Sequence, residues 1–175
     1  LRLSLAALLI VAAAGPIWNP PVAAQRSNAP LALLIDDGWS AAAAWDARLR
    51  TAEDLIARAE ADNRGVALVP ISEPTRDLSF EAPGTARVRL KQIRPKPHTV
   101  ERADILPTLT RFLAATPDAE IAWLSDGVDA GKAADFVAAL ARAVERRPVT
   151  VFEGGLRPAL ALTGADNAAG ALAVK

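Results

Sequence analysis

The 175-residue sequence contains no cysteine, methionine or tyrosine, a single histidine, and no excess of charge of either sign. Without cysteine there is no disulfide framework, thiolate nucleophile or cysteine-based zinc site, and one histidine cannot build a multi-histidine metal centre. Twenty Lys and Arg residues balance twenty Asp and Glu residues, so no net field draws the chain to nucleic acid. We therefore expect no nucleic-acid partner.

An apolar run occupies the start of the chain, where Ser4 is the only polar side chain between Arg2 and Trp18. A bilayer core needs about 20 apolar residues, so the run is marginal in length. The missing polar face and the place of Trp18 favour a transmembrane helix over residues 1–18. Two alternatives stay open: a secretory signal peptide cleaved near Ala24, and a buried helix of a globular core. Both membrane interpretations leave Arg2 in the cytoplasm and place the rest outside it.

Residues 19–30 carry three prolines and several polar side chains, which predicts an extended tether. Apolar runs then alternate with helical patterns over residues 31–155. The expected strands cover residues 31–35, 65–71, 120–124 and 148–152, and the expected helices cover residues 43–63, 100–115 and 132–145. This alternation predicts an α/β fold, with a doubly wound, mostly parallel sheet and helices on both faces. Residues 156–175, with short strands expected at 159–162 and 171–174, are interpreted as the start of a truncated C-terminal segment.

Two finer expectations concern packing. Residues 86–93 alternate between polar and apolar side chains among four prolines, which predicts an edge strand between loops. Six apolar side chains on the inward faces of the predicted elements should pack into a single shared core. These side chains are Trp45, Leu55, Val69, Leu124, Phe136 and Val151.

Acidic loops follow two of the predicted strands, at residues 36–40 and 125–129. In parallel α/β sheets, ligands bind beyond the carboxyl ends of the strands, so these loops mark the candidate site. Adjacent residues on a strand point to opposite faces, so Asp36 and Asp37 should not act on one substrate as an acid–base pair. His98 lies between Pro97 and Thr99, and we expect it to be an exposed loop residue.

Residues 33–40 (Leu-Leu-Ile-Asp-Asp-Gly-Trp-Ser) resemble the first segment of a von Willebrand factor A domain. Residues 124–127 (Leu-Ser-Asp-Gly) resemble the later strand end of that family. The Ala-Gly-Pro-Ile-Trp run at 14–18 is similar to a membrane helix of bacterial BatA-like aerotolerance proteins. Together with residues 163–167 (Thr-Gly-Ala-Asp-Asn), the Asp-Gly-Trp run resembles bacterial membrane-anchored proteins with a domain of unknown function numbered 4159.

The resemblance implies a metal-ion-dependent adhesion site formed by Asp36, Ser40 and Asp126, with Thr99, or secondarily Thr108, as the family's threonine. Gly38 replaces the family's first serine, so one hydroxyl ligand is missing and we expect Mg²⁺ to bind weakly or not at all. Oxygen ligands of this kind suit Mg²⁺. The alternative is purely structural: Asp36 caps the following helix and Asp126 belongs to an ordinary turn.

The function that these patterns predict is a non-enzymatic protein-interaction module, with an unidentified protein as its partner. The resemblance places it in the bacterial inner membrane with its domain on the periplasmic side. Trp39, in a loop, is the candidate partner-binding residue, because tryptophan is enriched at interaction hot spots. Its alternative role is packing over the domain's own edge. A metal-dependent hydrolase that uses Asp36 and Asp126 is the alternative function, and a purely structural envelope domain without a ligand is a third.

Overall fold

The structure, a computed structural model, describes residues 28–75, 77–129, 132–153, 165–168 and 171–174. Within these ranges no helix combines the length and apolar character needed to cross a membrane. The transmembrane helix predicted at residues 1–18 and the short strand predicted at 159–162 lie outside the described residues.

The central element is a parallel sheet whose four described strands run in the order β2-β1-β3-β4. Strand bounds are Leu31–Ile35 (β1), Val66–Pro70 (β2), Glu120–Ser125 (β3) and Val149–Glu153 (β4). In register, Leu33 lies between Leu68 of β2 and Ala122 of β3. Strands β1 and β2 and residues 121–124 of β3 are apolar throughout, as expected of strands that are covered on both faces. The prediction of a mostly parallel α/β sheet is confirmed.

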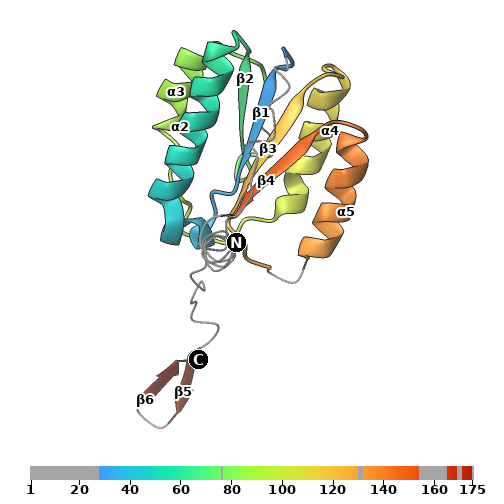
Figure 1. Cartoon of the computed structure of the whole chain (residues 1–175). Coiled ribbons are helices and arrows are strands. Elements are labelled where there is room, and N and C mark those ends of the chain that lie inside the picture. Colours follow the sequence, from blue (N-terminus) through green and yellow to red (C-terminus); the bar gives the residue numbers. More distant parts are fainter. Residues whose placement is uncertain (1–27, 76, 130–131, 154–164, 169–170, 175) are drawn as a thin grey trace, which may run out of the picture.

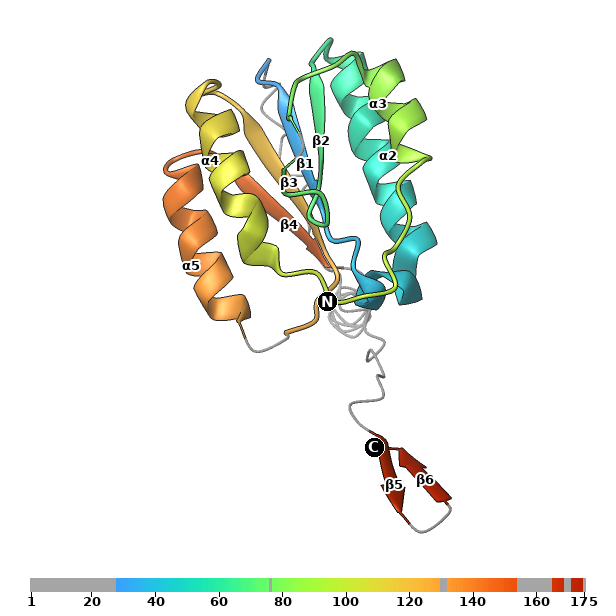
Figure 2. The same cartoon turned by 180° about the vertical axis from the view of Figure 1, so that it is seen from behind.

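Helices cover both faces of this sheet (Figures 1 and 2). One layer contains the 3-10 helix η1 (Trp39–Ala44), α2 (Trp45–Ala61) and α3 (Pro83–Leu90), and the other contains the 3-10 helix η2 (Arg102–Ile105), α4 (Leu106–Ala114) and α5 (Ala133–Val144). The apolar stripe of α2 packs on the sheet through Trp45, Ala52, Ile56 and Ala59. On the opposite face, α5 packs through Phe136, Leu140 and Val144.

The expectation of one shared core is wrong, because the sheet divides the apolar interior into two clusters. Alternate residues of each strand point to opposite faces. Leu124 therefore joins Trp45 in the cluster under α2 and α3, whereas Val69 joins Phe136 in the cluster under α4 and α5.

The edge strand predicted at residues 86–93 is also wrong, because helix α3 covers most of that range. Pro83 lies at the start of the helix, where its fixed φ favours helical backbone and its missing N–H costs nothing. Ala86 and Leu90, four residues apart, are buried against α2, while Val88 is 61% exposed. Apolar Val88, between Ala86 and Leu90, gives this segment the alternating pattern that is typical of a strand. The segment is nevertheless a helix, in which only a narrow stripe is buried.

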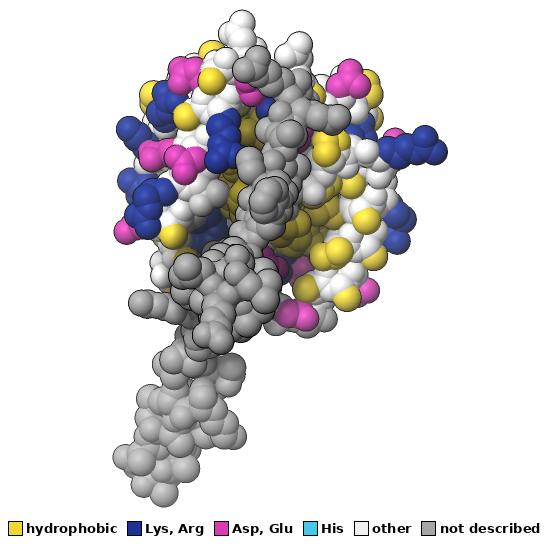
Figure 3. Space-filling model, in the orientation of Figure 1, with side chains coloured by type: hydrophobic (Ala, Val, Ile, Leu, Met, Phe, Trp, Pro, Cys, Tyr) yellow, Lys and Arg dark blue, Asp and Glu magenta, His cyan; other side chains and the backbone are white. Residues whose placement is uncertain are grey.

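Strand β4 forms one edge of the described sheet. Val151, expected in the core, is 46% exposed there, so that prediction is wrong. Hydrophobic side chains are visible between the two helical layers on this side of the molecule (Figure 3). The strand predicted at residues 171–174 is confirmed as β6 (Ala171–Val174), which pairs antiparallel with β5 (Ala165–Ala168).

Phe136→Ala should lower the free energy of unfolding by about 3 to 5 kcal/mol, the usual cost of deleting a buried phenyl ring. The ring is 3% exposed and packs edge-on against Trp123 with a centroid separation of 5.3 Å. Reversible urea unfolding measures the change. The neighbouring Val137, 49% exposed on the same helix, is the control, and Val137→Ala should change stability by about 0.5 kcal/mol or less. Equal losses in the two variants would contradict the packing of α5.

Candidate functional site

Two aspartates follow neighbouring strands at the same edge of the sheet. Asp36 comes directly after β1, and Asp126 comes directly after β3. Because β1 and β3 are parallel and paired, their carboxyl ends bring the two residues together. The main-chain N–H of Asp126 donates to Oδ2 of Asp36 at 3.0 Å. The side chains are 3% and 6% exposed respectively, so the site holds two nearly buried carboxylates.

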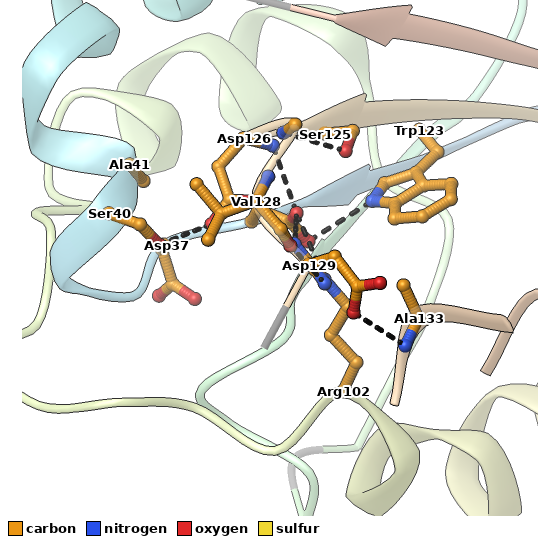
Figure 4. Close-up of polar contacts among 12 residues, drawn as sticks. Asp37, Ser40, Ala41, Arg102, Trp123, Ser125, Asp126, Val128, Asp129 and Ala133 are labelled. Carbon is orange, nitrogen blue, oxygen red and sulfur yellow. Dashed lines mark hydrogen bonds and ion pairs between the residues drawn. The ribbon is translucent and has the colours of Figure 1, made fainter. Parts of the chain in front are cut away.

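The guanidinium of Arg102 forms ion pairs with both carboxylates. Figure 4 shows Arg102 beside the loop that carries Asp126 and Val128. Its Nη2 donates to Oδ2 of Asp36 at 2.9 Å and also to Oδ1 of Asp126, while Nε donates to Oδ2 of Asp36 at 3.2 Å. Its Nη1 donates to the carbonyl of Val128 at 2.9 Å. Arginine suits this position, because its planar fork of donors matches carboxylate geometry and stays charged.

The remaining carboxylate oxygens also have partners. The indole Nε1 of Trp123 donates to Oδ1 of Asp36 at 3.1 Å, and the Ser40 hydroxyl donates to Oδ2 of Asp126. The N–H of Val128 donates to Oδ1 of Asp126 at 2.9 Å. Every oxygen of the two carboxylates thus accepts at least one hydrogen bond, as buried charged groups require.

A second arginine, Arg48 of α2, lies buried near the pair, at 4% exposure. Its Nη1 donates to the carbonyl of Ala41 at 2.8 Å and its Nη2 to the carbonyl of Ser125 at 3.2 Å. These bonds connect the loop after β1 to the end of β3. Two cationic side chains therefore accompany two carboxylates, and their formal charges balance.

Asp37, fully buried, takes part in a separate contact. Its carboxylate accepts the main-chain N–H of Ser72 at 2.9 Å and the Ser72 hydroxyl at 2.6 Å. The loop after β2 is fixed in this way to the loop after β1. Adjacent residues on a strand point to opposite faces, and as this predicted, Asp36 and Asp37 contact different partners.

Burial sets the direction of the main pKa shifts. It raises the pKa of Asp36, against the opposing hydrogen bond and charge of Arg102. Burial also raises the pKa of Asp37, against the two hydrogen bonds from Ser72. For Arg102, burial lowers the pKa, but the hydrogen bond and charge of Asp36 and the charge of Asp126 outweigh it, and the net shift is upward. The arginine is therefore held in its charged form.

The structure brings Asp36, Ser40 and Asp126 together and places the other predicted residues around them. Thr99 is exposed and lines a small cavity of about 40 Å³ beside Asp36 and Arg102. Thr108 lies elsewhere and donates to the carbonyl of Pro74 at 2.5 Å.

Two further predicted residues lie in the loop after β1. Trp39, half-buried, begins η1, and its N–H donates to the carbonyl of His98 at 3.2 Å. His98 is exposed as expected. At Gly38 an added Cβ would meet Val100 Cγ2 at 3.5 Å, an ordinary contact, so sterics do not demand glycine there.

The helix-cap alternative for Asp36 is wrong. Helix η1 has no side-chain cap bond at its first turn, and the Asp36 carboxylate faces Trp123, Arg102 and the N–H of Asp126 instead. Asp126 likewise contacts distant parts of the chain as well as its own turn. The two aspartates therefore form a site shared between loops.

The donor set is oxygen-rich, as a hard cation prefers, but its oxygens already face a guanidinium. In the described part of the chain, no three His, Cys, Asp or Glu side chains group closely enough to hold a metal ion. A metal ion would have to displace Arg102 to reach both carboxylates. The residues present therefore fit a bound arginine better than a bound Mg²⁺.

Both arginines were absent from the predicted site. Arg102 lies outside the two acidic loops, and no spacing rule links it to them. Arg48 did carry a signal, because it falls between Trp45 and Ala52 on the apolar stripe of α2. A basic residue at a core-facing helical position predicts a buried cation, which needs an acidic or carbonyl partner.

Comparisons with known proteins find likenesses among solved structures. The chain is similar to a solved structure described as von Willebrand factor type A from Catenulispora acidiphila, with a TM-score of 0.47 and 14% sequence identity. The match covers 73% of this chain and 33% of that one, so this chain spans about a third of its length. No family model matches the sequence, and no curated protein does.

Asp37→Asn should be more stable than the parent, and the difference in the free energy of unfolding should grow as pH increases. Because burial raises the folded-state pKa of Asp37, the parent loses stability as pH rises from the unfolded-state value, about 3.9, through the folded-state value. Asn does not titrate and can still accept the Ser72 N–H. The two proteins should be about equally stable near pH 3, with the variant gaining above that and reaching a plateau past the folded-state pKa.

Urea unfolding across this pH range measures the difference. Asp118→Asn removes an exposed carboxylate and controls for the change in net charge. A variant that is less stable than the parent at every pH would show that the fold needs the negative charge of Asp37.

Proposed function

We propose that this chain is a membrane-tethered protein-interaction module that presents the carboxyl edge of its sheet to a protein partner without needing a divalent cation. The observation that carries the proposal is the position of Arg102 between Asp36 and Asp126. A site that is charge-balanced from within needs no metal ion to be stable. The resemblance of residues 33–40 and 124–127 to von Willebrand factor A domains supports the interaction role.

A metal-dependent hydrolase is less well supported by the same contacts. Such an enzyme needs carboxylate oxygens free to hold a cation and to orient a water molecule. The oxygens of Asp36 and Asp126 accept bonds from Arg102, Trp123 and Ser40. Asp37, the remaining acid of the first loop, is bonded to Ser72. Reaction chemistry would require this whole network to open.

The size of the cavity also favours a macromolecular partner. Small-molecule sites usually enclose about 300 to 1,000 Å³. The two cavities that Arg102 lines are smaller, at about 40 Å³ and about 230 Å³. Thr99, which is exposed, lines both cavities, and the half-buried Trp39 lies in the chain between Gly38 and Ser40, which line the smaller one. An aromatic side chain among polar ones is typical of a protein-binding surface.

The tether part of the proposal comes from the sequence. Residues 1–18 act as the membrane anchor and residues 19–30 as the spacer. The domain from residue 31 then lies on the periplasmic side of a bacterial inner membrane, where it meets its partner. Mg²⁺ has at most a weak role in this account.

Site-specific photocrosslinking in native membranes tests the proposal. A benzophenone amino acid replaces Trp39, the membranes are washed with carbonate, and adducts are detected after irradiation. The expected result is a defined protein adduct that forms equally in EDTA and in MgCl₂, on a chain that stays with the washed membranes.

The matched control carries the same photoreactive group at Val88, which is 61% exposed on α3, away from the strand ends. Adducts at position 39 no stronger than those at position 88 would contradict the interaction surface. Adducts that require MgCl₂ would contradict metal independence, and release of the chain by carbonate would contradict the tether.

A further inference from the structure

Strand β4 carries an unpaired edge. It pairs with β3 on one side, and no strand of the described residues pairs with its other side. The main-chain N–H of Ile121 donates to the carbonyl of Pro148 at 3.0 Å, so Pro148 faces β3. Main-chain groups of successive strand residues point to alternate sides. The N–H and C=O groups of Val149, Val151 and Glu153 are therefore directed away from β3, where a further strand can pair with them.

The side chains of β4 divide between the two faces of the sheet. Val149 packs against the apolar cluster under α5, and Phe152 packs against the cluster under α2. Because side chains alternate, Val151 lies on the face of Val149, and Thr150 lies on the face of Phe152. Val151 is 46% exposed, and Thr150 is exposed as well. Residues 149–153 contain no lysine or proline, which are common devices against pairing at an edge.

This edge is complementary to itself in the opposite direction. Residues 147–153 are Arg-Pro-Val-Thr-Val-Phe-Glu. An antiparallel second copy with Thr150 opposite its own counterpart makes three further kinds of pair, which are Val149 with Val151, Pro148 with Phe152, and Arg147 with Glu153. Apolar pairs, threonine pairs and opposite charges are combinations that stabilise antiparallel strands. With Val151 on the axis instead, Glu153 would lie opposite Val149 and the charge pair would be lost.

The charges at the two ends of the edge are complementary. The side chain of Arg147 is only 10% exposed, and its Nη atoms donate to the carbonyls of Val144 and Leu113 at 3.1 and 2.8 Å. Its Nε has no hydrogen-bond partner among the described residues. Its contact with the carboxylate of Glu145 is long, at 4.0 Å, and Glu145 is 77% exposed. Glu153 is exposed at the other end, so an antiparallel copy supplies the anionic partner that a mostly buried cation requires.

Helix α5 extends this surface beside β4 (Figure 1). Phe136 and Leu140 face the sheet, and α4 contacts the helix on the flank where Ala139 and Ala143 are half-buried. The other flank carries small apolar side chains that are exposed, which are Ala134, Val137 and Ala141. A two-fold axis at Thr150 brings this flank towards the same flank of the second copy. Small side chains allow two helices to approach closely.

We propose that the chain forms a two-fold symmetric homodimer in which β4 pairs antiparallel with β4 of a second copy, with Thr150 on the axis. The same surface patch is used by both copies, as in most homodimers. The pairing joins the two four-stranded sheets into one and covers both unpaired edges of β4. This inference concerns a different surface from the proposed function and does not depend on it.

Disulfide crosslinking of the full chain in detergent tests the register, because the sequence has no cysteine of its own. Thr150→Cys should form a disulfide-linked dimer on mild oxidation, since opposed residues that do not share hydrogen bonds lie about 4.5 Å apart at Cα, within disulfide reach. Val149→Cys and Val151→Cys should each crosslink poorly alone and well when the two are co-expressed. Val88→Cys, at a site 61% exposed on α3, controls for random collision.

Analytical ultracentrifugation in detergent measures the strength of association. Val151→Lys should raise the dissociation constant at least about tenfold, because a lysine at an edge opposes strand pairing. Val88→Lys makes the same substitution away from β4 and should leave the dissociation constant unchanged. Glu153→Lys should also weaken the dimer, because it places a second cation opposite Arg147. These side chains are exposed, so the far-ultraviolet circular dichroism of each variant should match that of the parent.

Four results would overturn the proposal. The first is a parent that stays monomeric, with Thr150→Cys crosslinking no better than Val88→Cys. The second is a dimer that Val151→Lys leaves intact, and the third is Val151→Cys crosslinking to itself better than Thr150→Cys does. The fourth is a disulfide from Thr150→Cys to a different protein, which would show that another strand occupies this edge.

Discussion

The arrangement of the sheet edge depends on one interaction, the pairing of a single guanidinium with two carboxylates. Parallel neighbours β1 and β3 end side by side, and each is followed by an aspartate. Two buried negative charges at such a place repel each other and lose hydration, so a positive group must join them. Arg102 supplies it, and the loops that carry Ser40 and Val128 are held by the same group of bonds. The geometry of the edge follows from charge balance as much as from packing.

Contacts of three other side chains at this edge of the sheet support the pairing. Trp123 uses the polar end of its indole to bind Asp36 and its ring to pack against Phe136, which connects the ion pair to the apolar cluster under α5. Arg48 joins the loop after β1 to the end of β3. Asp37 joins the first loop to the loop after β2 through Ser72. Polar side chains thus join the carboxyl ends of β1, β2 and β3. The apolar pattern of the sequence does not predict these contacts.

Much of the fold could be predicted from the sequence, because apolar runs and helical spacing report burial directly. The meeting of Asp36 with Asp126 followed from the parallel sheet. The prediction failed where a local pattern was ambiguous, as in α3, and where a strand at the edge exposed Val151. Arg102 could not be found from spacing, since the pairing is a long-range contact fixed only by the folded chain.

The most direct measurement is a double-mutant cycle between Arg102 and Asp126, using Arg102→Gln, Asp126→Asn and the double variant, with unfolding free energies determined in EDTA. If the guanidinium is the cation that holds the two strand ends together, the coupling energy should be about 2 kcal/mol or more, because Asp126 is nearly buried and Arg102 is only 15% exposed. A coupling within about 0.5 kcal/mol of zero, the range of independent sites, would contradict the account.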